Sequence, residues 1–152
     1  MELLIEKGVD VNAQGGEFGN ALQAASLKGH EAISKLLIKK GADVDVQGGC
    51  YGNALQAASY GGHKAIVQLL IDKGADGNAQ GGFYGNALQA ALCGGHNMIA
   101  KHLIDEGVDV HAKGGRFGNA LQAASYGGHE DIAKLLINEG VDVNTAPMYH
   151  WH

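Results

Sequence analysis

Apolar residues along this chain follow helical spacings inside a unit that begins again every 33 residues. In the unit formed by residues 45–77, the run Ala54–Tyr60 holds good helix formers and is small on one side, so another helix can approach it closely. The next run, His63–Lys73, carries an apolar stripe at helical spacing formed by Ile66, Leu69 and Leu70. The pattern predicts two helices separated by a turn at Gly61-Gly62.

Polar residues and glycines mark the ends of these two helices. Asn53 precedes the first helix, and Gln56 lies three positions after Asn53, which is the spacing of a capping box. Gly74 follows the second helix and is a stop signal. Residues 75–85 are rich in glycine and short of apolar alternation, so they predict an extended turn or a hairpin finger.

The whole chain repeats this unit in register. The string Gly-Asn-Ala-Leu-Gln-Ala-Ala begins at Gly19, Gly52, Gly85 and Gly118. Units this small cannot bury their apolar faces alone, so they stack into a solenoid. The sequence predicts one all-α domain, residues 1–152, made of a half repeat (1–11), four repeats (12–44, 45–77, 78–110 and 111–143) and a tail (144–152).

The string Gly-His-x-x-Ile-x-x-Leu-Leu-Ile-x-x-Gly-Ala/Val-Asp-Val-Asn at a 33-residue period resembles the ankyrin repeat. The Thr-Pro-Leu-His of that family is replaced by Asn20-Ala-Leu-Gln23 and its counterparts, a variant similar to arrays common in large fungal proteins. This similarity implies excision from a longer array. The resemblance also implies an ankyrin-repeat solenoid whose fingers and first helices line a concave groove that binds a protein partner, with the second helices as the convex back.

Composition and charge narrow the partner classes. The 152 residues are 45% apolar and 18% charged, with a net charge of −5, which disfavours disorder and nucleic-acid binding. No apolar run is long enough for a membrane span, and the N-terminus lacks a signal-peptide pattern, so we expect a cytoplasmic protein. Cys50 and Cys93 lie 43 residues apart without a metal-binding motif, which predicts reduced thiols.

Residues that differ between the repeats are the candidates for partner contacts, because repeat proteins place their binding residues where the repeats vary. One variable position lies in the finger and another at the end of the first helix. The predicted contacts are Glu17, Cys50, Phe83 and Arg116 in the fingers, and Leu27, Lys28, Tyr60, Cys93 and Tyr126 on the helices. Aromatic side chains and arginine suit a protein interface. The aromatics that do not vary, Phe18, Tyr51, Tyr84 and Phe117, are expected to pack between neighbouring fingers.

Metal binding and catalysis receive little support from the residues. His30, His63, His96 and His129 recur once per repeat, and equivalent atoms of stacked repeats lie roughly 10 Å apart, whereas zinc ligands lie about 2 Å from one metal. His102 takes the place of a core leucine and is expected to have a backbone partner. Ser26, Ser59 and Ser125 lie on predicted helices without a nucleophile motif, so we expect neither an enzyme nor a cofactor.

Three alternatives stay open beside protein recognition. Groove aromatics with Arg116 and His111, or His150 and His152 of the tail, are candidates for a small-molecule or metal site, with or without catalysis. The chain is otherwise a structural spacer of a larger protein, or it associates end to end through the apolar half repeat, which holds Leu3, Leu4 and Ile5. Gly77 stands where other repeats have valine, and restoring valine is expected to stabilise the fold by roughly 1–2 kcal/mol if the site is buried.

Overall fold

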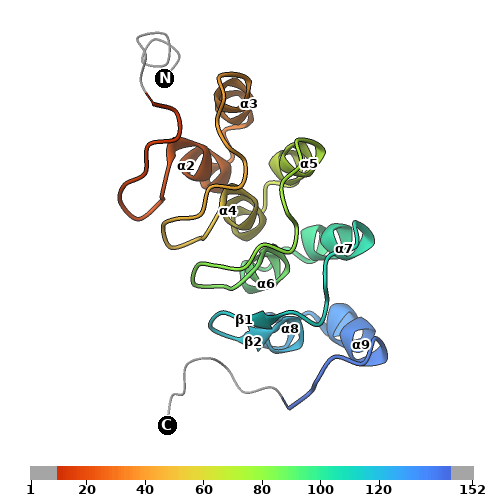
Figure 1. Ribbon diagram of the computed structural model, residues 1–152. Coiled ribbons are helices and arrows are strands. Elements are labelled where there is room, and N and C mark those ends of the chain that lie inside the picture. The colour runs from red at the N-terminus through yellow and green to blue at the C-terminus, as the bar shows by residue number, and fades with distance from the viewer. Residues whose placement is uncertain (1–9, 145–152) are drawn as a thin grey trace.

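The computed structural model describes residues 10–144, in which helix pairs stack along one direction (Figure 1). The first helices are α2 (Ala21–Lys28), α4 (Ala54–Gly61), α6 (Ala87–Cys93) and α8 (Ala120–Gly127), and the second helices are α3 (Glu31–Lys39), α5 (Lys64–Asp72), α7 (Asn97–Asp105) and α9 (Glu130–Asn138). A two-stranded hairpin is formed by β1 (Lys113–Gly114) and β2 (Gly118–Asn119). The finger loops lie on one side of the first helices and the second helices lie on the other. The predicted all-α solenoid is confirmed.

The helix ends lie within one residue of the predicted ones. α4 extends to Gly61 rather than Tyr60, and α5 begins at Lys64 because His63 is its N-cap residue. The chain leaves α4 through Gly62, whose φ of +83° lies in the left-handed region that glycine adopts readily. Predictions that concern residues 1–9 and 145–152, including the apolar half-repeat face and His150 and His152, lie outside the described residues.

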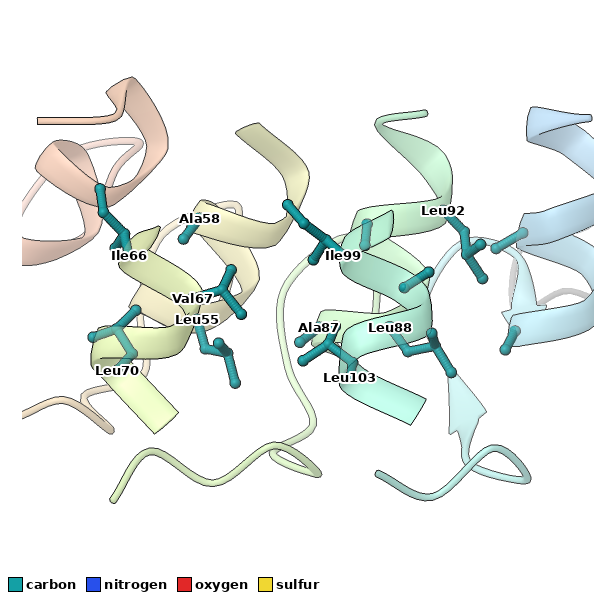
Figure 2. Close-up of a cluster of buried hydrophobic side chains, with 14 of the residues drawn as sticks. Leu55, Ala58, Ile66, Val67, Leu70, Ala87, Leu88, Leu92, Ile99 and Leu103 are labelled. Atoms are coloured by element: carbon teal, nitrogen blue, oxygen red, sulfur yellow. The ribbon is translucent and has the colours of Figure 1, made fainter. Parts of the chain in front are cut away.

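The core runs between the two rows of helices and continues from repeat to repeat (Figure 2). On α5, Ile66, Val67 and Leu70 are 1% exposed or less, whereas Leu69 is only half-buried. The predicted stripe is therefore correct at two positions and wrong at Leu69. At about 100° per residue, positions 66, 67 and 70 share one buried arc and position 69 lies beside it. Ala57 and Ala58 of α4 are fully buried, as the predicted close approach requires.

In the first two described repeats, one glutamine both caps its own helix and holds the next finger. Gln56 Nε2 donates to the carbonyl of Gly81 at 3.1 Å, while Asn53 and Gln56 form the predicted capping box. In the preceding repeat, Gln23 Nε2 donates to the carbonyls of Gly48 and Gly52, each at 2.9 Å. These glutamines are buried, so the hydrogen bonds satisfy polar groups that water cannot reach.

The fingers are joined to one another by backbone hydrogen bonds. The amide of Cys50 donates to the carbonyl of Glu17 at 2.8 Å, that of Phe83 to Cys50 at 2.8 Å, and that of Arg116 to Phe83 at 2.9 Å. Each bond links a finger to the one before it. The last finger forms the β1–β2 hairpin and the third has a bridge between Gly81 and Gly85, which confirms the predicted finger.

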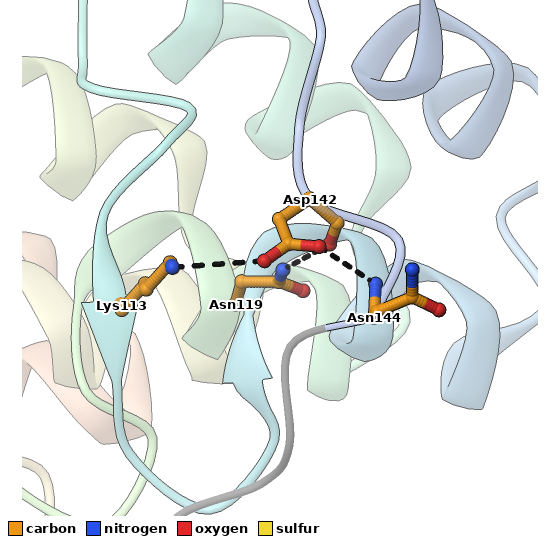
Figure 3. A network of polar contacts seen from close by, with 4 residues as sticks. All are labelled: Lys113, Asn119, Asp142 and Asn144. Carbon is orange, nitrogen blue, oxygen red and sulfur yellow. Dashed lines mark hydrogen bonds and ion pairs between the residues drawn. The ribbon is translucent and has the colours of Figure 1, made fainter.

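A second set of hydrogen bonds links the loops that follow the second helices. The amide of Asp76 donates to Asp45 Oδ1 at 2.9 Å, and the amide of Asp109 donates to Asn78 Oδ1 at 2.6 Å. His111 occupies the equivalent position in the last described repeat. There, two other residues hold the Asp142 loop (Figure 3): Asn119 Nδ2 donates to the Asp142 carbonyl at 2.9 Å, and Lys113 Nζ lies 3.7 Å from Asp142 Oδ2.

Candidate recognition surface

The two predicted rows of contact residues meet on one side of the solenoid. Tyr60, at the end of α4, lies with its ring 5.4 Å from that of Tyr51 and 4.8 Å from that of Tyr84, both in fingers. We call the surface formed by the finger tips and the ends of the first helices the finger face. The structure therefore connects the variable helix position directly to finger aromatics.

Three tyrosines from two repeats form the centre of this surface, and we call Tyr51, Tyr60 and Tyr84 the tyrosine cluster. The rings of Tyr60 and Tyr84 are stacked with an interplanar angle of 18°, and those of Tyr51 and Tyr84 lie 6.3 Å apart. Phe83 meets Tyr84 edge to face at 5.1 Å. Such ring pairs stabilise one another beyond their buried area, so the cluster has a defined shape before any partner arrives.

Arg116 extends the aromatic surface toward the last described repeat. Its guanidinium carbon lies 5.3 Å from the ring centre of Phe83 and 5.4 Å from that of Phe117, which are cation–π distances. The ring of Phe117 also lies 4.7 Å from that of Tyr126, at the end of α8. Residues from the third and fourth fingers and from α8 are thus held together.

A hollow of about 460 Å³ opens between the second and third fingers. Its walls are Gly49, Cys50, Tyr51, Gly82, Phe83 and Tyr84. The following finger carries Phe83 where the second finger carries Cys50, and the last carries Arg116. Cys50 has the smallest side chain at this variable finger position and lies in the wall of the hollow.

Burial controls the protonation of the groups around this surface. Burial raises the pKa of the Cys93 thiol to about 12, and the nearby Arg116 charge offsets only part of that effect. Burial, followed by a side-chain hydrogen bond to Tyr60, raises the pKa of Tyr84 above its usual range. Burial is also the main cause that raises the pKa of Tyr51, with Tyr60 and Glu17 adding to it. At neutral pH these groups are uncharged, and Cys93 lacks the thiolate that a nucleophile needs.

The first described repeat contributes less to the finger face than the other three. Glu17 is exposed and its charge acts on Tyr51, but Leu27 is half-buried and Lys28 is exposed at the end of α2. Within residues 10–144, neither Leu27 nor Lys28 has a ring contact or ion pair with the tyrosine cluster. Cys50, Tyr60, Phe83, Cys93, Arg116 and Tyr126 form the connected part of the predicted set.

The invariant aromatics have a second role that their invariance did not indicate. Tyr51 and Tyr84 pack between neighbouring fingers as predicted, but they also line the hollow. Phe18 remains 38% exposed and Phe117 packs on Tyr126. Comparison between repeats finds positions that differ, so it carries no signal for a contact residue that every repeat shares.

Two of the recurring histidines, His63 and His129, join neighbouring repeats. His63 Nε2 lies 2.9 Å from the carbonyl oxygen of Leu27, and His129 Nε2 lies 2.9 Å from that of Leu92. A Cβ at Gly29 would lie 2.5 Å from the His63 ring, so glycine there leaves room for the imidazole of the next repeat. Within residues 10–144, no group of three or more His, Cys, Asp or Glu side chains is placed to hold a metal ion.

The prediction for His102 is wrong. In place of a backbone partner, its Nε2 faces Oε1 of Glu106, the C-cap residue of α7, at 3.9 Å, and this buried nitrogen has no hydrogen bond to another described residue. The backbone carbonyls of a helix already accept hydrogen bonds from amides one turn later, so they are poor partners for the His102 ring. The Glu106 carboxylate lies one turn beyond His102 on the same face and can approach the ring. The predicted helical serine Ser125 donates from Oγ to the Leu121 carbonyl at 2.8 Å.

Comparison with known protein families identifies the repeat. The family model described as ankyrin repeats, three copies, matches residues 1–81 and again residues 78–147. Comparison with curated proteins gives no match. No helix among residues 10–144 combines the length and the apolar character that crossing a membrane requires. Since the two matched segments cover nearly the whole sequence, the chain belongs to the ankyrin repeat family.

Proposed function

We propose that this chain is a protein-interaction module that binds its partner through the finger face, the concave groove of the array. Ankyrin repeats generally serve as protein-interaction modules. The central contacts are Cys50, Tyr60, Phe83, Cys93, Arg116 and Tyr126, with Glu17, Leu27 and Lys28 at the edge formed by the first repeat. The observation that carries the proposal is the ordered aromatic surface around the tyrosine cluster and its open hollow.

The side-chain chemistry of this surface fits a protein partner. Tyr126 is 68% exposed and Phe83 is 39% exposed, and both are held by neighbouring aromatic or cationic groups. Aromatic residues and arginine supply much of the binding free energy at protein interfaces. Because ring contacts already fix these side chains, less conformational entropy is lost when a partner covers them.

Affinity capture from a cell lysate with two matched variants tests the proposal. One variant combines Phe83→Ala with Tyr126→Ala, which removes two exposed rings from the finger face. The control, Met98→Ala, removes a side chain that is 64% exposed on α7, away from the finger face. We expect a protein captured by the native chain and by the control to be lost with the finger-face variant. Equal capture by all three chains would overturn the proposal, and no capture by any of them would favour a spacer role.

The hollow also favours a second candidate, binding of a small apolar molecule. Its volume of about 460 Å³ lies within the usual range for ligand sites, although two finger loops alone form its walls. Titration with an anilinonaphthalene sulfonate dye, followed by fluorescence, tests whether the hollow accepts such a ligand. Saturable binding that Cys50→Phe abolishes and Met98→Ala retains would support this candidate, and equal fluorescence of both variants would exclude the hollow as the site.

A further inference from the structure

The row of second helices, which we call the back of the array, has two halves of opposite charge. The basic half consists of α3 and α5 with their C-cap residues, and the acidic half consists of α7 and α9 with theirs. The basic half contains five lysines and two acidic residues: Lys35, Lys39, Lys40, Lys64 and Lys73, with Glu31 and Asp72. The acidic half contains five acidic residues and two lysines: Asp105, Glu106, Glu130, Asp131 and Glu139, with Lys101 and Lys134.

This reversal occurs at equivalent positions of the repeat. Lys39 and Asp105 lie two 33-residue units apart, as do Lys73 and Glu139. Equivalent residues occupy the same turn of their helices, so the opposite charges stand at the same height on the back. The change of sign falls between α5 and α7, in the middle of the row of second helices (Figure 1).

The basic half surrounds an apolar hollow with ammonium groups. This hollow, of about 420 Å³, is lined by Lys35, Ile38, Lys39, Leu69 and Lys73. Lys35 pairs with Glu31 at 3.1 Å on the same helix, but Lys39 and Lys73 have no ion pair with another residue in the described part of the chain. Their charges are open to an acidic surface.

The acidic half offers complementary chemistry. Asp105, Asp131 and Glu139 are exposed and, over residues 10–144, have no ion pair. Met98 is 64% exposed and Leu135 is 37% exposed on the same two helices. Each half therefore combines apolar side chains with unpaired charges, and the two halves differ in sign.

We propose that two copies of this chain pair back to back and antiparallel. A twofold axis near the boundary between α5 and α7 brings the basic half of each copy against the acidic half of the other. A parallel arrangement would place charges of the same sign together. The antiparallel arrangement forms the same complementary contact twice, which gives the closed twofold symmetry that is commonest among oligomers.

The size of the back predicts a weak dimer. A nine-residue helix is roughly 13 Å long, and four helices spaced roughly 10 Å apart present on the order of 500 Å² per copy. Stable interfaces bury about 800 Å² per partner, so we expect dissociation constants in the micromolar range or weaker. Since the contact depends on exposed charges, salt will weaken it. The finger faces of both copies remain accessible, so the dimer does not depend on the proposed recognition function.

Sedimentation velocity of the full chain, with charge-swapped variants, tests the dimer. At about 0.05 M salt the mass should rise with concentration from 15.7 kDa toward twice that value, and at about 0.5 M salt the rise should be lost. Lys39→Glu with Lys73→Glu, and separately Asp105→Lys with Glu139→Lys, should each weaken the dimer at least about tenfold. Mixing these two variants should restore a dimer, because every altered contact then regains opposite charges.

A matched variant separates this contact from a general effect of net charge. Lys28→Glu with Gln47→Glu and Gln80→Glu changes the net charge by the same amount as the first pair, at exposed residues away from the second helices. It should dimerise like the native chain. A monomer at every concentration in low salt, a mass that grows beyond the dimer, or a dimer that ignores the charge swaps would each overturn the proposal. Growth beyond the dimer would point to head-to-tail association through the ends.

Discussion

Gln56 donates from its buried side chain to the carbonyl of Gly81 in the next repeat, at 3.1 Å, while its Oε1 accepts from the Asn53 amide at the same distance. A single side-chain amide therefore caps the start of α4 and positions the following finger. Only a side chain with both a donor and an acceptor can make these two hydrogen bonds.

Gln56→Glu should destabilise the fold strongly. A carboxylate keeps the acceptor for Asn53 but faces the Gly81 carbonyl without a donor, in a site that is 1% exposed. We expect a loss of about 2–4 kcal/mol in the free energy of unfolding, measured by urea denaturation. Gln80→Glu, at an exposed position, serves as the control and should change stability by less than about 0.5 kcal/mol. Equal effects of the two substitutions would refute the role of the Gln56 donor.

Gly77→Val should stabilise the fold by about 1 kcal/mol, at the lower end of the expectation from sequence. Gly77 is half-buried, and its backbone does not need glycine, but a Cβ there would lie 2.9 Å from Val108 Cγ1. Val108 can turn aside, because Val110 and Val141 show that two valines coexist at the equivalent positions of the next repeat.

Thermal unfolding measures this gain as a rise of a few degrees in the midpoint. Gly74→Val provides the contrast, since Gly74 has a φ of +91° that a β-branched residue does not adopt without strain. The Gly74 variant should melt at a lower temperature than the native chain. A Gly77 variant that also melts lower would show that the contact with Val108 outweighs the benefit.

Stability should fall as the pH rises above about 9. The Cys93 thiol has a pKa of about 12 in the folded chain, above the ordinary value of 9.0, so the folded state holds its proton more tightly than the unfolded state. The contribution of the protonated Cys93 thiol to the free energy of unfolding is fully present below pH 9 and is lost progressively between pH 9 and 12. The raised pKa values of Tyr84 and Tyr51 act in the same direction above pH 10.

Urea denaturation at several pH values between 7 and 11, with Cys93→Ser as the comparison, tests this linkage. The variant should lose less stability than the native chain between pH 9 and 10, before the tyrosines contribute. Alkylation with iodoacetamide at pH 8 gives an independent measurement, in which Cys50, which is exposed, should react well before Cys93. Equal alkylation rates would contradict the assigned burial of Cys93.

Arg116→Gln should loosen the contact between the last two described fingers with only a small loss of overall stability. The guanidinium lies over the rings of Phe83 and Phe117, and cation–π contacts at partly exposed sites are worth about 0.5–1 kcal/mol. Hydrogen exchange of the Arg116 amide, which donates to the Phe83 carbonyl, reports on this finger locally. Unchanged exchange would show that the backbone bond alone holds the finger.

Sequence periodicity predicted the helix pairs, the capping box and the fingers because each depends on residues close together in the chain. Asn53 and Gln56 are three residues apart, and their geometry follows from local helix chemistry. The second hydrogen bond of Gln56, to Gly81, was not predicted, since it spans 25 residues and depends on how one repeat sits on the next.

The recognition surface was predictable in its variable residues and not in its shape. Differences between repeats selected Tyr60 and Phe83, but stacking of Tyr60 on Tyr84 depends on side-chain rotation in three dimensions. The hollow beside Cys50 lies between two fingers, so its shape depends on how neighbouring fingers are spaced, which a residue pattern does not display. The charges of the second helices can be read from the sequence, but only the structure places these helices in one row and so shows that the two signs occupy separate halves of one surface.

The backbone bonds between finger tips, such as the one from Cys50 to Glu17, are arranged in series along the array. A pulling force applied along the array would therefore act on each junction between repeats, where the finger bond and the core contacts share the load, and the weakest junction would part first. Extension would then proceed in steps of one 33-residue unit, each releasing a fixed length of chain. In mechanical terms the described array is a short series of similar units, and each unit can open before its neighbours do.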